Sequence, residues 1–226
     1  MREFFSYYAV YEGVTYRVKN YQDRVELFAI EDKERKDVIM SVPKDKLDDN
    51  YSLINDAILN GIRYVFYDIE DKRVTYGTAY KDSPLLQRDI TDFDLIYQRV
   101  LRGKNEPVEK RAIYPENSEA LIKEFYPQER PDGSVMFSAD SKKISAQDLI
   151  DVIRILYKGK VREGRKDVTT DVVIKHVSVD GIELRIVDDL CWEITDICPE
   201  QKGRGEDLIF EIVAYLNEYT TRYISS

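Results

Sequence analysis

The sequence predicts an α+β fold, in which a small β-rich N-terminal module precedes an α+β module of antiparallel strands packed by helices. Three observations lead to this prediction. Short runs in the N-terminal third place apolar residues at alternate positions, as half-buried strands do. Residues 146–157 and 206–219 instead carry apolar residues at helical spacing. Between these two predicted helices lie three runs rich in Val and Ile, which favour strands.

The N-terminal module is predicted to be a meander of short strands with one helix. Residues 6–11 and 14–19 read as two strands, because Glu12-Gly13 suits a two-residue hairpin turn. Residues 51–59 show helical spacing of Leu, Ile and Ala, which predicts a helix. Together these elements indicate a small barrel, of the SH3-like kind. Further strands are predicted at 25–30, 38–40, 62–69 and 74–80, and the module is expected to span residues 1–82.

The second module is expected over residues 83–226. Ser145 suits the N-cap of the helix at 146–157, and Asp180-Gly181 marks the clearest hairpin turn in the chain. Residues 103–117 contain two prolines in polar surroundings and read as a linker. We identify no internal repeat in the sequence. The remaining predictions are helices at 92–101 (capped by Thr91), 118–126 and 206–219, and strands at 135–137, 172–179, 182–187 and 190–197.

Composition excludes several classes of protein. The 226 residues include 34 Lys and Arg against 43 Asp and Glu, a formal net charge of −9. This balance disfavours nonspecific binding of nucleic acid, and it favours a basic partner or simply serves solubility. One histidine and two cysteines cannot form a His-rich or four-thiolate metal site, so any metal would be held mainly by oxygen; we expect no metal. We find no signal-peptide pattern and no membrane-spanning run, and we expect a cytoplasmic protein with no membrane partner.

The turn around Gly203 and Gly205 follows a predicted strand and opens the last predicted helix, and such turns can bind a pyrophosphate. At residues 198–209 the chain resembles the acetyl-CoA loop of GNAT acetyltransferases. Lys202 stands where that loop has Arg or Gln, and Asp207 replaces its final small residue. The resemblance implies an acyl-CoA-dependent N-acyltransferase as the alternative function. A second interpretation is a plain turn, with Glu206 and Asp207 complementing the helix dipole.

Three other segments have a chemical and a structural interpretation. Asp188, Asp189 and Glu193 can hold a divalent cation or act as an acid/base pair, or they can form a solvated turn. His176 lies in a predicted strand and suits either a general base or a packed histidine. Residues 158–166 form a basic segment, predicted to be a loop, which can contact phosphate or simply be solvated. No catalytic constellation emerges, and we expect no catalytic residue and no cofactor.

Tyrosine is unusually frequent, with 17 residues against 8 Phe and 1 Trp. Alternation places Tyr7 and Tyr11 on one face of their strand and Tyr8 on the other. One face enters the core, and the other is either a protein-binding surface or ordinary β-sheet surface. Tyr64, Tyr67, Tyr76 and Tyr80 add to the set in later strands.

An acidic, Tyr-rich chain of this kind resembles the immunity proteins of bacterial polymorphic toxins, and residues 8–18 are similar to the small β-barrel modules of such proteins. The resemblance implies a non-catalytic inhibitor that binds a basic cognate toxin directly. No nucleic acid is expected as a partner. The residues predicted to bind the partner are Tyr7, Tyr11, Tyr16, Tyr21, Asp188, Asp189 and Glu193.

Overall fold

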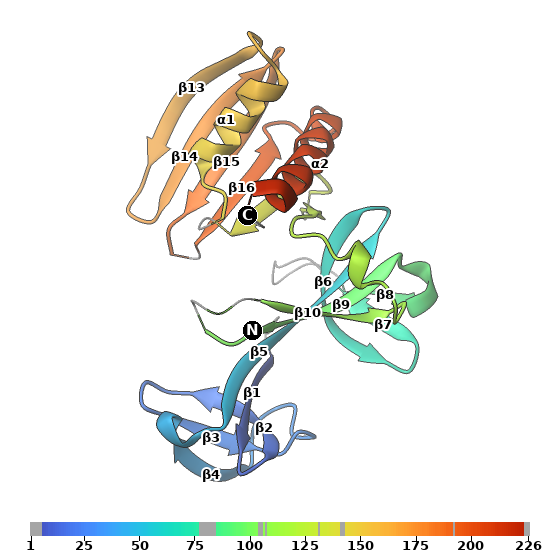
Figure 1. The fold of residues 1–226 in the computed structure, drawn as a ribbon, viewed down its shortest axis with the longest axis vertical. Helices are drawn as coiled ribbons and strands as arrows, with labels where there is room; N and C mark the ends of the chain where they lie inside the picture. Colours follow the sequence, from blue (N-terminus) through green and yellow to red (C-terminus); the bar gives the residue numbers. More distant parts are fainter. Residues whose placement is uncertain are drawn as a thin grey trace. The chain divides into compact units, whose positions relative to one another are not determined.

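A computed structural model describes residues 6–76, 85–103, 106, 108–130, 132–140, 143–191 and 193–223. The protein is mostly β: strands hold 53% of this part of the chain, which contains two α-helices (Figure 1). The α+β prediction is therefore wrong. Contacts divide the chain into two compact units, Met1–Ile58 with Val65–Ile122 and Leu59–Tyr64 with Lys123–Ser226. The boundary predicted at residue 82 lies outside the described residues.

The first unit is built from strands and short 3-10 turns. The strands pair in the order β4–β3–β2–β1–β5–β9–β10, while β6, β7 and β8 extend from β5. The segment Leu59–Tyr64, which contains the end of β5 and the start of β6, is counted with the second unit. The elements are β1 (Ser6–Tyr11), β2 (Val14–Asn20), β3 (Arg24–Phe28), β4 (Val38–Pro43), η1 (Lys44–Lys46), β5 (Asp49–Leu59), β6 (Ile62–Glu70), β7 (Arg73–Tyr76), β8 (Leu86–Asp89), η2 (Ile90–Asp92), β9 (Leu95–Leu101), β10 (Glu109–Tyr114) and η3 (Glu119–Leu121).

Several predicted elements of this unit differ from the structure. The helices predicted at 51–59 and 92–101 are the strands β5 and β9, and the helix at 118–126 is reduced to η3. The predicted linker contains β10. The error at β5 has a physical cause: Ala57 and Ile58 are both buried although they are neighbours. A strand that is covered on both faces loses the apolar/polar alternation and cannot be distinguished from a buried helix by its spacing.

The first unit contains the same structural motif twice, which the sequence did not reveal. The first copy consists of β1, β2, β3, β4 and η1 and ends with β5. The second copy begins with β5, continues through β6, β7, β8 and η2, and ends with β9. β5 is therefore the last strand of the first copy and the first strand of the second. Asp48 N donates to Val10 O at 2.8 Å, and Asp94 N donates to Ile58 O at 2.9 Å, at equivalent points. Equivalent positions pack inside both copies: Ala9 and Ala57, Val18 and Phe66, Val25 and Val74, Leu27 and Tyr76, Leu47 and Phe93.

The second unit is a sheet covered by two helices on one face (Figure 1). Its strands pair in the order β13–β14–β15–β16–β12–β11, and both helices contribute to one buried cluster with them. Ser145 caps α1 in a capping box with Asp148, as its sequence predicts. The elements are β11 (Pro127–Glu129), β12 (Val135–Asp140), α1 (Ala146–Leu156), β13 (Val161–Val168), β14 (Val172–Val179), β15 (Ile182–Asp189), β16 (Ile194–Pro199) and α2 (Glu206–Tyr223).

The predictions for this unit fare better. Both helices and the Asp180-Gly181 hairpin are confirmed, the two turn residues having φ angles of 51° and 80°. The prediction that the basic segment at residues 158–166 is a loop is wrong, because most of this segment lies in the edge strand β13. No helix among the described residues combines the length and the apolar character needed to cross a membrane.

A buried ion pair links the first and last strands of the second copy of the repeated motif. Asp56 of β5 is fully buried and accepts from Arg99 of β9, at 2.5 Å from Nε and 3.2 Å from Nη2. We predict that Asp56→Ala lowers the free energy of unfolding by about 3 kcal/mol, because it leaves a half-buried guanidinium without its bidentate partner. Chemical denaturation measures this. Asp89→Ala, which breaks the exposed Arg73–Asp89 pair at 3.0 Å, is the control and should cost less than about 1 kcal/mol.

Candidate protein-binding surface

Two tyrosines and two arginines form a row across the strands of the first unit. Tyr8 lies directly opposite Arg17 of β2 and Tyr51 of β5, so the three side chains share one face of the sheet. The tyrosine rings stack with their centroids 5.7 Å apart and their planes 19° from parallel. Arg17 lies 5.4 Å from the Tyr8 ring, and Arg102 lies 5.8 Å from the Tyr51 ring. We call these four residues the Tyr/Arg row.

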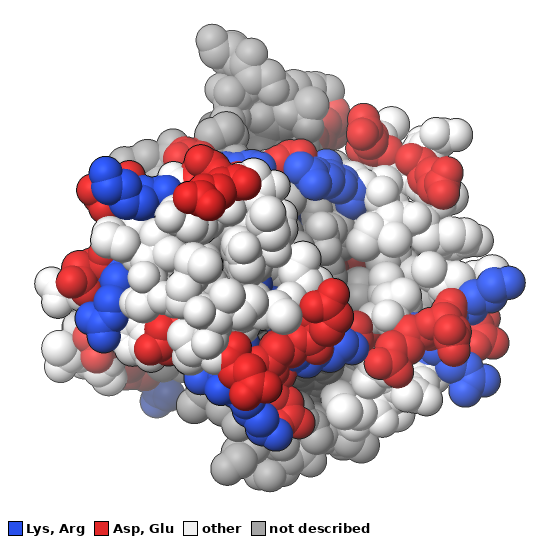
Figure 2. Space-filling view, turned by 90° about the horizontal axis from the view of Figure 1, so that it is seen from below, with Lys and Arg blue, Asp and Glu red and all other residues white. Residues whose placement is uncertain are grey.

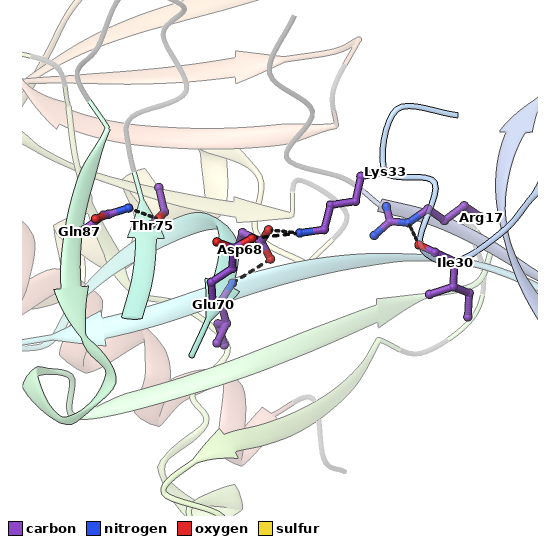
Figure 3. A network of polar contacts seen from close by, with 8 residues as sticks. Arg17, Ile30, Lys33, Asp68, Glu70, Thr75 and Gln87 are labelled. Carbon is purple, nitrogen blue, oxygen red and sulfur yellow. Dashed lines mark hydrogen bonds and ion pairs between the residues drawn. The ribbon is translucent and has the colours of Figure 1, made fainter. Parts of the chain in front are cut away.

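Hydrogen bonds hold both ends of the Tyr/Arg row. Arg17 Nε donates to the carbonyl oxygen of Ile30 at 2.7 Å (Figure 3). Arg102 Nε donates to Asp49 at 3.1 Å, and its Nη1 donates to Glu109 at 2.9 Å. Glu109 also accepts from Arg111 Nε at 2.6 Å. Side chains that are fixed before binding lose little conformational entropy when a partner arrives.

The electrostatics of the row suit a protein partner better than a phosphate. Asp49 and Glu109 neutralise the guanidinium of Arg102, so this end of the row presents no excess of positive charge. Burial raises the pKa of Tyr51, so its phenol stays neutral and can donate or accept. The side chains remain partly exposed, that of Arg102 by 30%. Rigid, partly exposed Tyr and Arg side chains are the types enriched in protein-binding hot spots.

The structure places the four tyrosines of the predicted surface away from this row. Tyr11 and Tyr16 pack against the buried cluster around Ala9, on the opposite face of the strands. Tyr7 and Tyr21 are each 38% exposed. Tyr21 donates to Glu26 at 2.9 Å and is covered by Arg24 at 4.9 Å.

The later tyrosines are structural where the structure describes them. Tyr76 is buried edge-to-face against Phe93, and Tyr64 donates to Glu129 at 3.0 Å within the second unit. Tyr80 and the side chain of Tyr67 lie outside the described residues.

The predicted acidic site lies in the second unit and largely supports its local fold. Asp188 accepts from Thr195 Oγ1 at 2.7 Å and from Ala146 N at 3.2 Å, which holds the first turn of α1. Asp189 accepts from Cys191 N at 3.0 Å, and Glu193 has a left-handed φ of 54°. Among the residues that the structure describes, no group of three or more His, Cys, Asp or Glu side chains is arranged to hold a metal ion.

Local hydrogen bonding and packing explain the glycines in the turn at residues 203–205. Gly203 N donates to Glu206 Oε1 at 2.7 Å, so the chain's own carboxylate occupies the N–H that a phosphate would need. Gly205 has a φ of +112°, and a Cβ there would lie 2.8 Å from Ile182 Cγ2. The pattern that resembles an acetyl-CoA loop is therefore accounted for by the turn and by packing, and the cofactor interpretation gains no support from it.

His176 holds strands together. Its Nδ1 lies 2.5 Å from Glu200, beyond the end of β16, and its Nε2 lies 3.1 Å from Asp167 in β13. Arg165 also approaches Nε2, at 3.2 Å. Both ring nitrogens are thus engaged with the chain's own carboxylates, an arrangement that favours the packed over the catalytic interpretation.

Sequence reasoning missed all four residues of the Tyr/Arg row as a site. The alternation of side chains along β1 did place Tyr8 on one face and Tyr7 and Tyr11 on the other. The face of Tyr8 is the one that carries the Tyr/Arg row. The sequence did not predict that Tyr51 lies on this sheet face, because the spacing of its segment indicates a helix and not a strand. The arginines give no signal, since their positions depend on pairing between strands distant in the sequence.

The carboxyl of Glu109 offers a direct check of this geometry. Arg111 and, second, Arg102 lower the pKa of Glu109 from its ordinary 4.5 to about 2. The pairing therefore persists above pH 4.5 and is lost only as the pH falls through about 2. We predict that Arg111→Ala raises this pKa toward 4.5, measured by an NMR titration of the carboxyl carbon. Arg24→Ala, which contacts Tyr21 instead, should leave it unchanged.

Comparison of the chain with models of protein families, with curated proteins and with solved structures finds no match.

Proposed function

We propose that this protein is a non-catalytic binding module that inhibits a protein partner, in the manner of the immunity proteins of bacterial toxins. The observation that carries the proposal is the Tyr/Arg row. It combines a stacked tyrosine pair with two anchored arginines on a half-exposed sheet face. Such side chains supply large contact areas at low entropic cost, and single anchors of this type contribute about 2–4 kcal/mol to binding.

Charge favours a basic partner. The net charge of −9 attracts a cationic protein over a long range and speeds its association. At short range the carboxylates beside the row, Asp49 and Glu109, are already paired with Arg102 and Arg111, so the preference for a basic partner comes from the net charge of the whole chain. We place the protein in the cytoplasm, where the free thiols of Cys191 and Cys198 would remain reduced.

The proposal predicts that replacing both ring partners, Tyr8→Ala with Tyr51→Ala, weakens binding at least about 100-fold, because roughly 3 kcal/mol of anchor contacts are removed. The tagged protein is used to capture its partner from source cells, and the affinity for the purified partner is measured by calorimetry. Inhibition is tested by expressing the captured partner alone and together with each variant. A toxic partner that the wild type neutralises, and the double variant does not, is the expected result.

Two matched controls make the experiment decisive. Tyr7→Ala and Tyr21→Ala each remove an exposed tyrosine of the same unit outside the row, and they should leave affinity within about threefold of the wild type. Melting curves confirm that each variant is folded. If the controls abolish binding while the double variant binds normally, the partner uses a surface around Tyr7 or Tyr21 and the row has no part in it. A captured partner that is harmless when expressed alone would contradict the inhibitory role.

A further inference from the structure

The two ends of the Tyr/Arg row differ in charge. Arg17 and Arg102 each lie over a tyrosine ring, but only Arg102 is neutralised, by Asp49 and Glu109. In the part of the chain that the structure describes, Arg17 has no carboxylate partner. Its one hydrogen bond there runs from Nε to the carbonyl oxygen of Ile30 at 2.7 Å (Figure 3). The two Nη groups of Arg17 can therefore bind a group from outside the chain.

The lack of a carboxylate at Arg17 stands out in a chain with a formal net charge of −9, in which carboxylates are in excess. Acidic and basic side chains lie close together around the broad uncharged area that is seen from below (Figure 2). The arginines of the first unit that pair with Asp or Glu are Arg24, Arg73, Arg99, Arg102 and Arg111. Arg17 departs from this pattern although it is held in a fixed position.

Lys19 is a second cation of this kind. It follows Arg17 by two residues in β2, so both side chains lie on the face that carries the Tyr/Arg row. Its Nζ lies 5.0 Å from the centroid of the Phe28 ring and donates to the carbonyl oxygen of Arg35 at 2.9 Å. Among the described residues, no carboxylate forms an ion pair with Lys19. Phe28 lies directly opposite Arg17 and is fully buried, so an apolar ring lies beneath the two cations.

Backbone carbonyl groups hold both side chains in place. The loop between β3 and β4 supplies the carbonyl oxygen of Ile30 to Arg17 and that of Arg35 to Lys19. Arg35 in turn donates from Nη1 to the carbonyl oxygen of Val18 at 3.3 Å, which ties the loop to β2. A carbonyl oxygen orients a cation and leaves its positive charge in place. A side chain that is fixed in this way loses little conformational entropy when it binds an anion.

Carboxylates beside the two cations have other partners within the chain. Glu26 lies directly opposite Lys19, but it accepts from the Tyr21 hydroxyl at 2.9 Å. Asp32, in the loop that holds both cations, accepts from the backbone N–H groups of Asp37 and then of Lys36, and these bonds lower the pKa of its carboxyl. Neither carboxylate forms an ion pair with the cations, so the site keeps its positive charge.

We propose that Arg17 and Lys19 form a binding site for a carboxylate of the protein partner, an inference that rests on the proposed function. The two Nη groups of Arg17 match the two oxygens of a carboxylate in a bidentate pair, and Lys19 adds a second positive charge. A singly charged carboxylate suits this site better than a phosphate, because residues 31–37 beside it carry one more acidic than basic residue. One acidic side chain of an otherwise basic partner thus fixes how the partner lies on the row.

Calorimetry with the captured partner tests the carboxylate site. Arg17→Gln should weaken binding about 30-fold, the effect of losing one anchor residue. Arg17→Lys should weaken it about tenfold, because an ammonium group cannot pair with both carboxylate oxygens. Arg24→Gln is the matched control and should stay within about threefold of the wild type, since Arg24 also lies over a tyrosine ring but pairs with Asp23. Melting curves show that each variant is folded.

A double-mutant cycle identifies the carboxylate on the partner. Each exposed Asp and Glu of the partner is changed to its amide, and one of these changes should cost little further affinity once Arg17→Gln is present. If Tyr8→Ala with Tyr51→Ala weakens binding but Arg17→Gln does not, or if no partner carboxylate couples to Arg17, the carboxylate site is wrong while the proposed function stands.

Benzoate tests the site without the partner, and so decides the proposal even if the proposed function fails. Its carboxylate can pair with Arg17 while its ring lies against the tyrosines of the row. In amide NMR spectra at constant ionic strength, millimolar benzoate should shift the signals of Tyr8, Arg17 and Lys19 in a saturable way, and Arg17→Gln should abolish these shifts. Equal shifts with uncharged benzamide, tighter binding of inorganic phosphate, or no shift with benzoate would each overturn the proposal.

Discussion

Strand β5 has to serve two copies of the same motif, and the first unit depends on this constraint. Its first half pairs with β1 and most of its length pairs with β9, so both neighbours are fixed by one strand. The buried Asp56–Arg99 pair holds β5 to β9 from within, where an unpaired charge would be costly. The same strand carries Tyr51 outward at its other end. The core and the proposed binding surface therefore share one structural support.

Equivalent positions in the two copies of the motif differ in burial and in charge. Tyr8 and Tyr51 form a partly exposed pair in the first copy, and the equivalent pair in the second copy, Asp56 and Tyr97, is buried. The edge strands diverge in the same sense, since β4 is apolar and β8 is charged. The proposed binding surface therefore lies in the first copy, while both copies contain buried apolar positions.

What the sequence could predict follows from how local each signal is. The capped helix after Ser145 and the Asp180-Gly181 hairpin were predictable, because caps and turns depend on adjacent residues. β5 was mistaken for a helix because burial on both faces removes the alternation that identifies strands. The repeated motif could not be recognised from the sequence, because its two copies share buried positions and turns but few identical residues. The Tyr/Arg row depends on strand register, which no local pattern encodes, and only the face of Tyr8 was foreseeable.

Ion pairs and backbone contacts hold the side chains of the Tyr/Arg row before any partner binds, and the proposed function depends on this prearranged surface. Hydrogen–deuterium exchange of the free protein and of its complex with the captured partner tests this account most directly. The account predicts slower exchange on binding in β1 and in the first half of β5, where Tyr8 and Tyr51 lie, with little change in α1 and α2. Slower exchange confined to the second unit, with β1 and β5 unchanged, would contradict it.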